Sequence, residues 1–331
     1  MMQLKYLFDN VPVSLMLLKN WDFDSDTINT IKPFRTSANA VYQFYNNNDK
    51  ETFYLRFAPL EEKDPVMVQS ELDFLEYLHD NGYNAVESVK SKDGSNLVVQ
   101  NTPWGKYLAV VFKAVPGKPI EKIEYSDLLY YNYGKSLGKL HKLSSNYKHK
   151  KVRRPDWKEQ LEYIRDILKE YSAPSNSLCE VEILYKFFLN LNVNSENYGL
   201  VHYDFETDNV FFDENSGIYS VIDFDDAIYH WYIIDIEQAV DYIQNELSEN
   251  FQNQAHEQFL SGYRSEKNID NDMLSLLPIF KRYVNLYGFA RCLRSIHEEW
   301  NNEPEWVTGL RAKLKNAMSK RSEEFGAKIN I

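Results

Sequence analysis

Cysteine is scarce in this chain. Cys179 and Cys292 are the only two among 331 residues, and they lie far apart. That spacing predicts neither a disulfide framework nor a cysteine zinc site. Long hydrophobic runs are also missing, because the apolar stretch Val11–Leu18 is far shorter than a bilayer span and has neither a basic leader nor a small-residue cleavage site. We therefore expect a packed helix there, in a cytoplasmic protein without a membrane partner.

Positive charge is also in short supply. The chain has 37 lysine and arginine residues against 49 aspartate and glutamate residues, a formal net charge of -12. Such a field repels nucleic acids and anionic membranes, so neither is expected as a partner, and a bound nucleotide would need local cations. The length of 331 residues, 44% of them hydrophobic, favours two domains or lobes.

The hydrophobic pattern changes along the chain. Ala40–Tyr45 and Thr52–Phe57 are predicted strands of a hairpin around the polar turn of residues 46–50, and a helix is predicted over Val66–Asp80. The other predicted strands are Ala85–Val89, Asn96–Asn101, Tyr107–Phe112, Leu200–His202, Val210–Phe212 and Tyr219–Ile222. The predicted helices of the second part are Ser126–Lys142, Asp156–Tyr171 and Leu178–Leu191, with further helices up to the C-terminus. This order predicts an α+β fold, with a small antiparallel-sheet N-lobe over residues 1–115 and a larger, mainly helical C-lobe over residues 116–331.

The most informative residues follow the predicted strand Leu200–His202. His202, Asp204 and Asn209 form the pattern H-x-D-x-x-x-x-N, and Asp223 follows the next predicted hairpin. Phosphoryl transfer needs a carboxylate at the attacking hydroxyl and oxygen ligands for Mg²⁺. We predict that Asp204 is the catalytic base and that Asn209 and Asp223 are the metal ligands. The alternative is an ordinary polar loop, because Asp and Asn are common in turns.

These residues resemble the aminoglycoside phosphotransferase and choline kinase superfamily. Its H-x-D-x-x-x-x-N loop and its I-D-F/W-D/E strand end match residues 202–209 and 222–225. Its G-x-x-L-A-x-L-H helix is similar to the segment from Gly134 to His141, and the similarity spans residues 30–245. The resemblance implies a bilobal, protein-kinase-like fold and an ATP- or GTP-dependent enzyme. Such an enzyme moves the γ-phosphoryl group to a hydroxyl of a small molecule such as an aminoglycoside, choline, homoserine or a sugar.

The resemblance also implies structural roles for two residues. His202 would support the catalytic loop, and Asp235 would brace this loop from the start of a helix. For Asp235, a simple helix N-cap is the alternative. From the residues themselves, His141 is expected to be a satisfied core histidine, and His230 a packed or capping residue.

A cation is expected on a strand that faces the nucleotide phosphates. Arg56 is the central cation of its predicted strand, and Glu71 lies within the apolar stripe of the following helix. Because a buried, unpaired carboxylate is costly, we predict an Arg56–Glu71 ion pair like the strand-to-helix pair of kinases, in which lysine takes the place of arginine. The alternative places Glu71 at the rim of the lobe and Arg56 in solvent.

The other predicted nucleotide contacts depend on position along the chain. Residues 35–40 take the place of a phosphate loop but contain no glycine. Ser37 and Asn39 are therefore expected to contribute side chains, unless the segment is a plain hairpin turn. The linker between the lobes is predicted at Phe112–Gly117, where adenine would pair with the backbone of Ala114 and Val115.

The acceptor site is predicted from polar and aromatic residues near the motif: Glu206, Asp225, Asp226 and Trp231. Asp225 is also expected to assist the metal, and a core position is the alternative for Trp231. Carboxylates in the segments that remain to build an acceptor cleft, among them Glu159, Glu162, Glu298 and Glu299, favour an amine-bearing acceptor, although such charges usually form solvated surfaces.

Two other classes of function remain as alternatives. A metal-dependent phosphoesterase would use histidines and aspartates of the same region, His202, Asp204, Asp208, Asp223, Asp225 and His230, but would have no use for Arg56 and Glu71. A catalytically silent nucleotide-binding module is disfavoured by the intact Asp204, Asn209 and Asp223. Protein-kinase activity is not expected, because Tyr203 replaces the arginine of H-R-D and Asp225 replaces the glycine of D-F-G.

Overall fold

The computed structural model describes residues 1–46 and 50–329, so most of the predicted turn at residues 46–50 lies outside the described residues. The chain forms two compact units. The first unit comprises Met1–Pro119, Lys148–Arg153 and Val210–Asp225, and the second comprises Ile120–Tyr147, Arg154–Asn209 and Asp226–Ile331. These units are defined by packing, so the division into functional lobes at residue 115 stays a prediction.

The first unit is built on an antiparallel sheet that has six strands within the described residues. The strand order is β1-β2-β3-β6-β4, and β5 also pairs with β6. The strands are β1 (Lys32–Thr36), β2 (Ala40–Tyr45), β3 (Thr52–Pro59), β4 (Ser88–Val89), β5 (Val98–Thr102) and β6 (Gly105–Lys113). The predicted hairpin is confirmed, because β2 pairs with β3 along its whole length.

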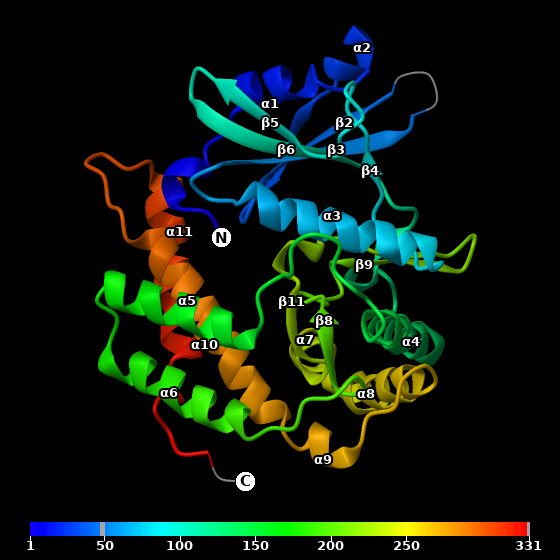
Figure 1. Ribbon diagram of the computed structural model, residues 1–331, viewed down its shortest axis with the longest axis vertical. Coiled ribbons are helices and arrows are strands. Elements are labelled where there is room, and N and C mark those ends of the chain that lie inside the picture. Colours follow the sequence, from blue (N-terminus) through cyan, green and yellow to red (C-terminus); the bar gives the residue numbers. More distant parts are fainter. Residues whose placement is uncertain (47–49, 330–331) are drawn as a thin grey trace. The chain divides into compact units, whose positions relative to one another are not determined.

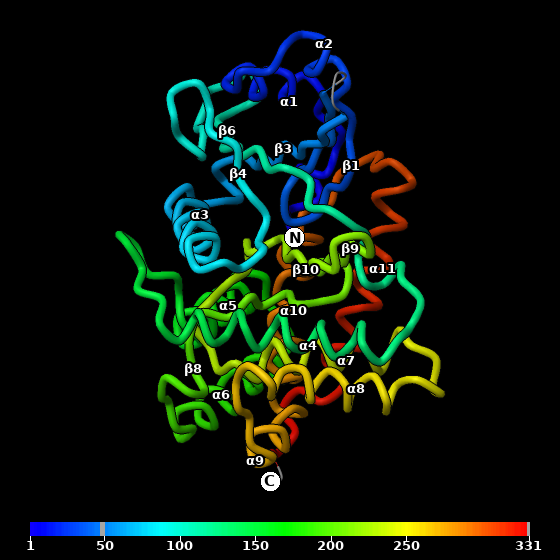
Figure 2. Tube along the Cα trace, turned by 90° about the vertical axis from the view of Figure 1, so that its right-hand side faces the viewer, coloured from blue at the N-terminus to red at the C-terminus, as the bar shows by residue number. Residues whose placement is uncertain are grey.

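Helices cover both faces of this sheet, as Figures 1 and 2 show for α1 (Val11–Leu18) and α3 (Pro65–Asp80). Leu55 and Phe57 of β3 belong to the hydrophobic core that includes α1. Side chains alternate between the two faces of a strand. Arg56, between these two residues, therefore points to the other face, where it contacts Glu71 of α3. The remaining helical segments of this unit are a 3₁₀ turn (Leu4–Tyr6) and α2 (Ser25–Ile28).

The start and end signals of α3 act as the sequence predicts. The Asp64 carboxylate accepts a hydrogen bond from the Val66 N–H at 2.8 Å, and Pro65 occupies the first turn, where its missing N–H costs nothing. Gly82, with a φ of 68°, follows the helix end in the left-handed conformation that glycine adopts without strain. These caps fix the position of α3 and therefore of Glu71.

A later hairpin also belongs to the first unit. β9 (Val210–Asp213) pairs with β10 (Ile218–Val221) and with the short β7 (Lys118–Pro119). The Val221 N–H donates to the Asn84 carbonyl, and the Val86 N–H donates to the Val221 carbonyl, both at 2.9 Å. This attachment explains why only Ser88–Val89 of the predicted strand Ala85–Val89 joins the main sheet as β4. Ala85 instead forms an isolated bridge with Val221.

The second unit is mainly helical. Its helices are α4 (Asp127–Ser144), α5 (Trp157–Glu170), α6 (Ser175–Leu189), α7 (Ile233–Glu246), α8 (Glu249–Arg264), α9 (Asn271–Leu274), α10 (Leu277–Ile296) and α11 (Glu305–Arg321), with a 3₁₀ turn at Ile120–Lys122. β8 (Tyr198–Val201) pairs with β11 (Ile228–Trp231). Helix was predicted where β11 lies. The strand forms by pairing with the distant β8, and such a pairing leaves no local signal in the sequence. The predicted α+β fold class is confirmed.

The glycines of the segment from Gly134 to His141 allow a close helix crossing between α4 and α8. A Cβ atom at Gly134 would lie 1.8 Å from the Phe259 carbonyl oxygen, and one at Gly262 would lie 1.7 Å from the Tyr131 carbonyl oxygen. Any larger side chain would therefore force the two backbones apart. This crossing brings His141 at the end of α4 next to Tyr263 of α8. None of the described helices combines the length and the apolar character needed to cross a membrane.

Candidate active site

The predicted catalytic loop, residues 202–209, is anchored by one buried carboxylate. Asp235, in the first turn of α7, accepts hydrogen bonds from the backbone N–H groups of His202 at 2.8 Å and Tyr203 at 2.7 Å. Tyr203 has a φ of 64°, an uncommon conformation for a side chain of this size. Because both N–H groups are bound by a side chain with no exposed surface, the loop is held in a conformation that its own sequence would not favour. This geometry matches the bracing role that the family resemblance implies for Asp235.

A histidine completes the surroundings of Asp235. His141 Nε2 lies 2.9 Å from Asp235 Oδ2, and His141 Nδ1 lies 2.9 Å from the Tyr263 hydroxyl. Burial lowers the pKa of His141, although Asp235 opposes the shift. The neutral ring therefore donates from Nε2 to the carboxylate and accepts from Tyr263. The expectation that His141 is a satisfied core residue is confirmed.

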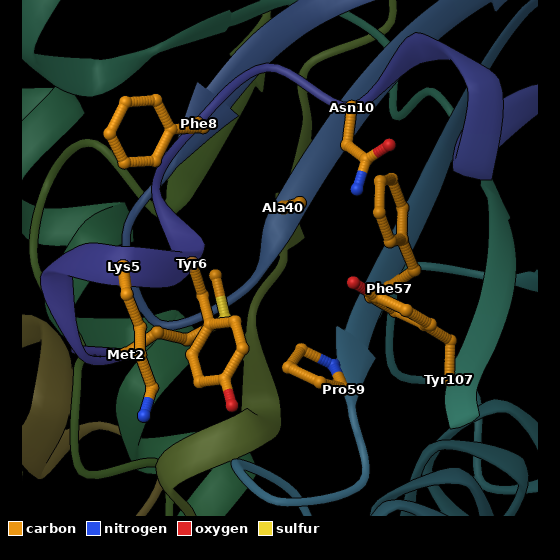
Figure 3. Close-up of a pocket in the computed structure, with 9 residues that line it drawn as sticks. All are labelled: Met2, Lys5, Tyr6, Phe8, Asn10, Ala40, Phe57, Pro59 and Tyr107. Carbon is orange, nitrogen blue, oxygen red and sulfur yellow. The ribbon is translucent and has the colours of Figure 1, made fainter. Parts of the chain in front are cut away.

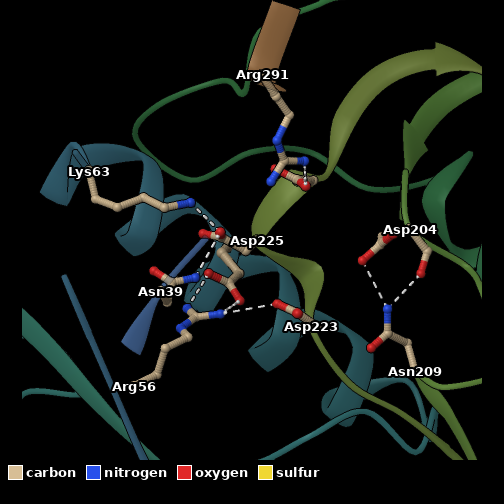
Figure 4. Close-up of polar contacts among 10 residues, drawn as sticks. Asn39, Arg56, Lys63, Asp204, Asn209, Asp223, Asp225 and Arg291 are labelled. Carbon is tan, nitrogen blue, oxygen red and sulfur yellow. Dashed lines mark hydrogen bonds and ion pairs between the residues drawn. The ribbon is translucent and has the colours of Figure 1, made fainter. Parts of the chain in front are cut away.

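Asp204 and Asn209 are joined within this loop. The Asn209 Nδ2 amide donates to Asp204 Oδ2 at 2.9 Å and to the Asp204 carbonyl at 3.0 Å, as Figure 4 shows. Both hydrogen bonds use the amide nitrogen, so the Asn209 Oδ1 oxygen faces away from Asp204. The arrangement orients the Asp204 carboxylate and presents a hard oxygen ligand of the kind that Mg²⁺ prefers.

The predicted ion pair of the first unit is present. Arg56 Nη1 and Nη2 donate to the two oxygens of Glu71 at 2.9 and 2.6 Å, and both side chains are buried. Burial lowers the pKa of Arg56, but Glu71, Asp225 and Asp223 outweigh this effect, so the pKa is raised overall and the group stays charged. Arg56 Nη1 also lies 3.7 Å from Asp223 Oδ1. The pair therefore links β3, α3 and the segment after β10.

The turn from Asp223 to Asp225 is fixed by its central aromatic residue. Phe224 is fully buried and meets Phe74 of α3 edge to face, with ring centroids 5.9 Å apart. Asp223, with a φ of 64°, keeps a side chain that is 45% exposed. Asp225 turns inward, where it pairs with Lys63 and accepts a hydrogen bond from Asn39 Nδ2 at 3.1 Å (Figure 4). The buried Phe224 thus lies between Asp223, whose carboxylate is partly exposed, and Asp225, whose carboxylate is paired with Lys63.

The other predicted nucleotide contacts occupy short connections. Ser37 and Asn39 lie between β1 and β2, and the Ser37 N–H donates to the Asn39 carbonyl at 3.0 Å. Ala114 follows β6, and its N–H donates to the Thr52 carbonyl at 2.8 Å. The backbone groups that remain for adenine are therefore the Ala114 carbonyl and those of Val115. The nucleotide-binding roles of these four residues stay predictions.

A small cavity of about 70 Å³ lies between the N-terminal segment and the sheet of the first unit (Figure 3). Met2, Tyr6, Phe57, Pro59 and Tyr107 are among the residues that line it. Pockets for drug-sized ligands measure roughly 300 to 1,000 Å³, so this cavity is too small for a nucleotide.

The residues predicted for the acceptor have diverse surroundings. Asp226 pairs with Arg291 of α10 and accepts from the Tyr287 hydroxyl at 3.3 Å. Burial by itself would lower the pKa of Arg291, but the charge of Asp226 and the neighbouring Tyr287 and Asp204 outweigh this effect. The pKa is therefore raised overall, and Arg291 stays charged. Trp231 has no exposed surface and donates to the Asn192 carbonyl at 2.9 Å, which supports its alternative core role. Glu206 lies partly buried in the catalytic loop.

The carboxylates that favoured an amine-bearing acceptor have structural partners of their own. Glu159 accepts from the Asp156 N–H in a capping box at the start of α5, Glu162 pairs with Arg165, and Glu299 lies 3.5 Å from Lys315. These contacts give each of the three carboxylates a structural role that needs no bound acceptor. The three residues therefore no longer favour an amine-bearing acceptor.

The tyrosine before Asp204 carries an unsatisfied group. The Tyr203 ring is packed against Tyr283 and Tyr287, and its hydroxyl finds no hydrogen-bond partner among the described residues. Burial raises the pKa of Tyr203 well above its usual value, so the hydroxyl stays protonated. His230, another neighbour, is buried in the same aromatic cluster with its pKa lowered to about 3, which confirms that it is a core residue.

Lys63, Arg291 and Tyr287 were missed by the sequence analysis. Lys63 lies in the connection between β3 and α3, and the other two lie on α10. No motif includes them, because each reaches its aspartate partner through tertiary packing. Residue spacing along one element could not have found them.

The metal ligands stay a prediction. Asn209 and Asp223 would supply one amide and one carboxylate oxygen, which suffice for Mg²⁺ when phosphates and water supply the other ligands. Within the described residues, no three or more histidine, cysteine, aspartate or glutamate side chains form a metal-binding group. His230 is in the aromatic core, and Asp225 is paired with Lys63. The phosphoesterase alternative therefore lacks the ligand cluster that it requires.

Comparison with known proteins decides the family. Residues 30–269 match the model of the phosphotransferase enzyme family, which is most of the chain. The chain belongs to the phosphotransferase enzyme family. The resemblance to aminoglycoside phosphotransferases is thus confirmed, as are the predictions of an enzyme and of phosphoryl transfer to a small molecule.

Relatives of this phosphotransferase match along nearly their whole length. It is 23% identical to the amicoumacin kinase of Bacillus subtilis (strain 168), with 98% of each chain covered. It superposes on an amicoumacin kinase in complex with AMP-PNP, Ca²⁺ and Ami with a TM-score of 0.76 at 21% identity, covering 95% of this chain and 94% of the other. For a microcompartment-associated aminopropanol kinase the TM-score is 0.68 at 18% identity, with coverage of 97% and 100%. The predicted protein-kinase-like fold is thereby confirmed.

Proposed function

We propose that this phosphotransferase is an ATP-dependent kinase that phosphorylates a hydroxyl of an antibiotic or small metabolite. The main support is the loop of residues 202–209, in which Asp204 is oriented by Asn209 while Asp235 holds the backbone. Relatives of matching length are named for amicoumacin and aminopropanol, and one was solved with AMP-PNP. We infer ATP as the donor from that complex.

In the proposed reaction, the acceptor hydroxyl oxygen bonds to the γ-phosphorus. The bond from this phosphorus to the β–γ bridging oxygen breaks, and ADP leaves. Asp204 accepts the hydroxyl proton, and the geometry that Asn209 imposes on its carboxylate favours an oriented attack. Asn209 and Asp223 would hold Mg²⁺, which neutralises phosphate charge when bound. Arg56, oriented by Glu71, would contribute a fixed positive charge.

The acceptor is proposed to be a hydroxylated molecule that also offers an oxygen to Arg291. Asp226 is compensated by Arg291, so this pair presents both signs of charge in the unit that holds Asp204. Purely cationic acceptors such as choline would gain less from such a pair than molecules that combine an amine with a carbonyl or carboxylate oxygen. Amicoumacin and aminopropanol are both tested because of the names of the relatives, and aminopropanol, which has an amine and a hydroxyl but no carbonyl or carboxylate, tests whether the oxygen offered to Arg291 is required.

The experiment is an ADP-release screen with ATP and with GTP. The acceptors are amicoumacin, aminopropanol, aminoglycosides, macrolides, choline, homoserine and methylthioribose, and Asp204→Asn is the blank. ADP release that depends on one acceptor and is absent from the blank would support the proposal and identify the substrate. If no acceptor raises ADP release and calorimetry detects no MgATP binding, the proposal is wrong.

A second experiment tests the metal ligands. Asp223→Ala should abolish the Mg²⁺-dependent part of nucleotide binding, which calorimetry with and without Mg²⁺ measures. Unchanged affinity in both conditions would remove Asp223 from the proposed ligand set.

A further inference from the structure

The first unit contains a cluster of two cations and three carboxylates. Arg56 pairs with Glu71 and approaches Asp223, while Lys63 pairs with Asp225. All five residues lie within one compact unit. The two cations differ in how many contacts hold them to their carboxylate partners.

Arg56 is held firmly by Glu71. Both terminal nitrogens of its guanidinium donate to that carboxylate, and its Cζ lies 4.9 Å from the centre of the Phe112 ring. Two of the five N–H donors of this guanidinium bind Glu71, so Arg56 contributes a fixed charge that cannot turn toward another anion without leaving its partner. A second, more flexible cation would therefore add to phosphate binding in this unit.

The predicted phosphate loop offers few backbone hydrogen-bond donors for a phosphate. Residues 35–40 contain no glycine, so backbone N–H groups are not predisposed to surround a phosphate. The Ser37 N–H is used within the turn, and the Asn39 amide is bound to Asp225. Few backbone donors of this loop are available to a nucleotide, and its one cation, Arg35, lies exposed in β1.

Lys63 has the features that this loop lacks. It lies in the turn after β3, where the N–H groups of Glu62 and Lys63 both bind the Pro59 carbonyl at 2.9 and 3.3 Å, and directly before Asp64, the N-cap of α3. Its backbone is thus fixed at both ends. Its ammonium ion has three donors on a flexible stem, its side chain is 19% exposed, and its partner Asp225 belongs to the same turn as Asp223.

We propose that Lys63 is a phosphate-binding residue of the nucleotide site, and that Asp225, itself bound by Asn39, holds it in the absence of nucleotide. This inference rests on the proposed function. When a nucleoside triphosphate binds, the Lys63 ammonium turns from the carboxylate to the terminal phosphates, which carry more negative charge. Lys63 then performs part of the role that lysine performs in kinases that have it on the strand.

The experiment measures nucleotide binding rather than turnover. Calorimetry gives the dissociation constants of MgAMP-PNP, MgADP and adenosine for the wild-type protein and for Lys63→Met, which keeps the apolar stem. We expect Lys63→Met to weaken MgAMP-PNP about 10- to 100-fold, as the loss of a charged hydrogen bond does, with a smaller loss for MgADP and less than about twofold for adenosine. Lys63→Arg should retain most of the affinity.

The matched control is Lys150→Ala, which removes an exposed lysine of the same unit that pairs with Glu76. It should bind all three ligands as the wild-type protein does. If Lys63→Met does not fold, as circular dichroism would show, Lys63→Gln gives the same test because glutamine can still donate to Asp225.

The outcomes separate the two proposals. Wild-type protein that binds no MgAMP-PNP overturns both the proposed function and the role of Lys63. Wild-type binding with equal affinity in Lys63→Met overturns the role of Lys63 alone. An equal loss for adenosine and MgAMP-PNP also overturns it, because Lys63 would then support the fold and not the phosphates.

Discussion

The two units hold their functional carboxylates by different means. In the second unit, Asp235 is saturated by two backbone N–H groups and a neutral histidine. In the first unit, Glu71 and Asp225 are held by the side chains of Arg56 and Lys63. Backbone donors are fixed by the fold, whereas an ammonium or guanidinium group can exchange one anion for another. The difference suits the proposed roles of the two regions, a rigid loop that would position a base and an adaptable cluster that would receive phosphates.

The largest expected effect is on the chemistry of the rigid loop. Asp204→Ala should lower turnover by about 10² to 10⁴ because a positioned base contributes that much. Nucleotide binding should survive, because the predicted nucleotide contacts lie in the first unit. ADP release and calorimetry measure the two quantities. Normal turnover in this variant would refute the assignment of the base.

The anchor of that loop should be nearly as sensitive. Asp235→Ala leaves two buried backbone N–H groups and a histidine without their acceptor, and we expect it to lower the free energy of unfolding by about 3–5 kcal/mol. Asp241→Ala, on the same helix and paired with Lys281 near the surface, should cost less than about 1 kcal/mol. Urea unfolding of both variants checks this contrast. Equal losses of unfolding free energy in the two variants would mean that the catalytic loop does not depend on the Asp235 carboxylate.

The buried ion pair of the first unit gives the matching test. Glu71→Ala strands the buried Arg56 charge and should cost about 3–5 kcal/mol. Glu76→Ala, on the same helix with an exposed partner, should cost no more than about 1 kcal/mol. The additional Arg56→Met change should recover part of the stability lost in Glu71→Ala, because it removes the stranded charge. A double variant less stable than Glu71→Ala would show that Arg56 packs without needing its partner.

The smallest expected effect concerns Glu237, two positions after Asp235. Burial raises the pKa of Glu237 to about 8, and the neighbouring Asp241 adds to the shift. In the unfolded chain this carboxyl has the usual pKa of a glutamate, near 4.5. Between these values the folded state binds more protons than the unfolded state, so stability falls as the pH rises from about 4.5 to about 8 and then levels off.

Glu237→Gln should remove this slope. We expect the variant to gain about 2 kcal/mol relative to wild type between pH 6 and pH 7.5, measured by urea unfolding at several pH values. Asp241→Ala at the same pH values is the control for the removal of nearby charge. Parallel pH profiles for Glu237→Gln and wild type would show that Glu237 ionises normally.

Much of this arrangement could be predicted because it is encoded locally. The alternation of Leu55, Arg56 and Phe57 indicated which residue leaves the core, and the position of Glu71 in the apolar stripe of its helix indicated where a partner was needed. The spacing of His202, Asp204 and Asn209 likewise predicted one loop with a carboxylate and an amide at its ends.

Other features could not be predicted because their partners are distant in the sequence. β11 exists only through its pairing with β8, and a run of four residues gives too weak a signal by itself. Trp231 and the carboxylates Glu159 and Glu162 looked available for an acceptor, but the core and neighbouring residues of the fold account for them. An aromatic or charged residue has the same identity in a core, in a helix cap and in a binding site.

The sequence alone predicted the reaction class, because the catalytic motif is a short, contiguous pattern of residue types that can be recognised without the rest of the chain. It also determined the α+β division, since periodicity is a local property. Only the tertiary structure decided which cation each aspartate receives, Lys63 for Asp225 and Arg291 for Asp226. Adjacent residues can face entirely different surroundings, and charge compensation depends on distances in space and not on separation along the chain.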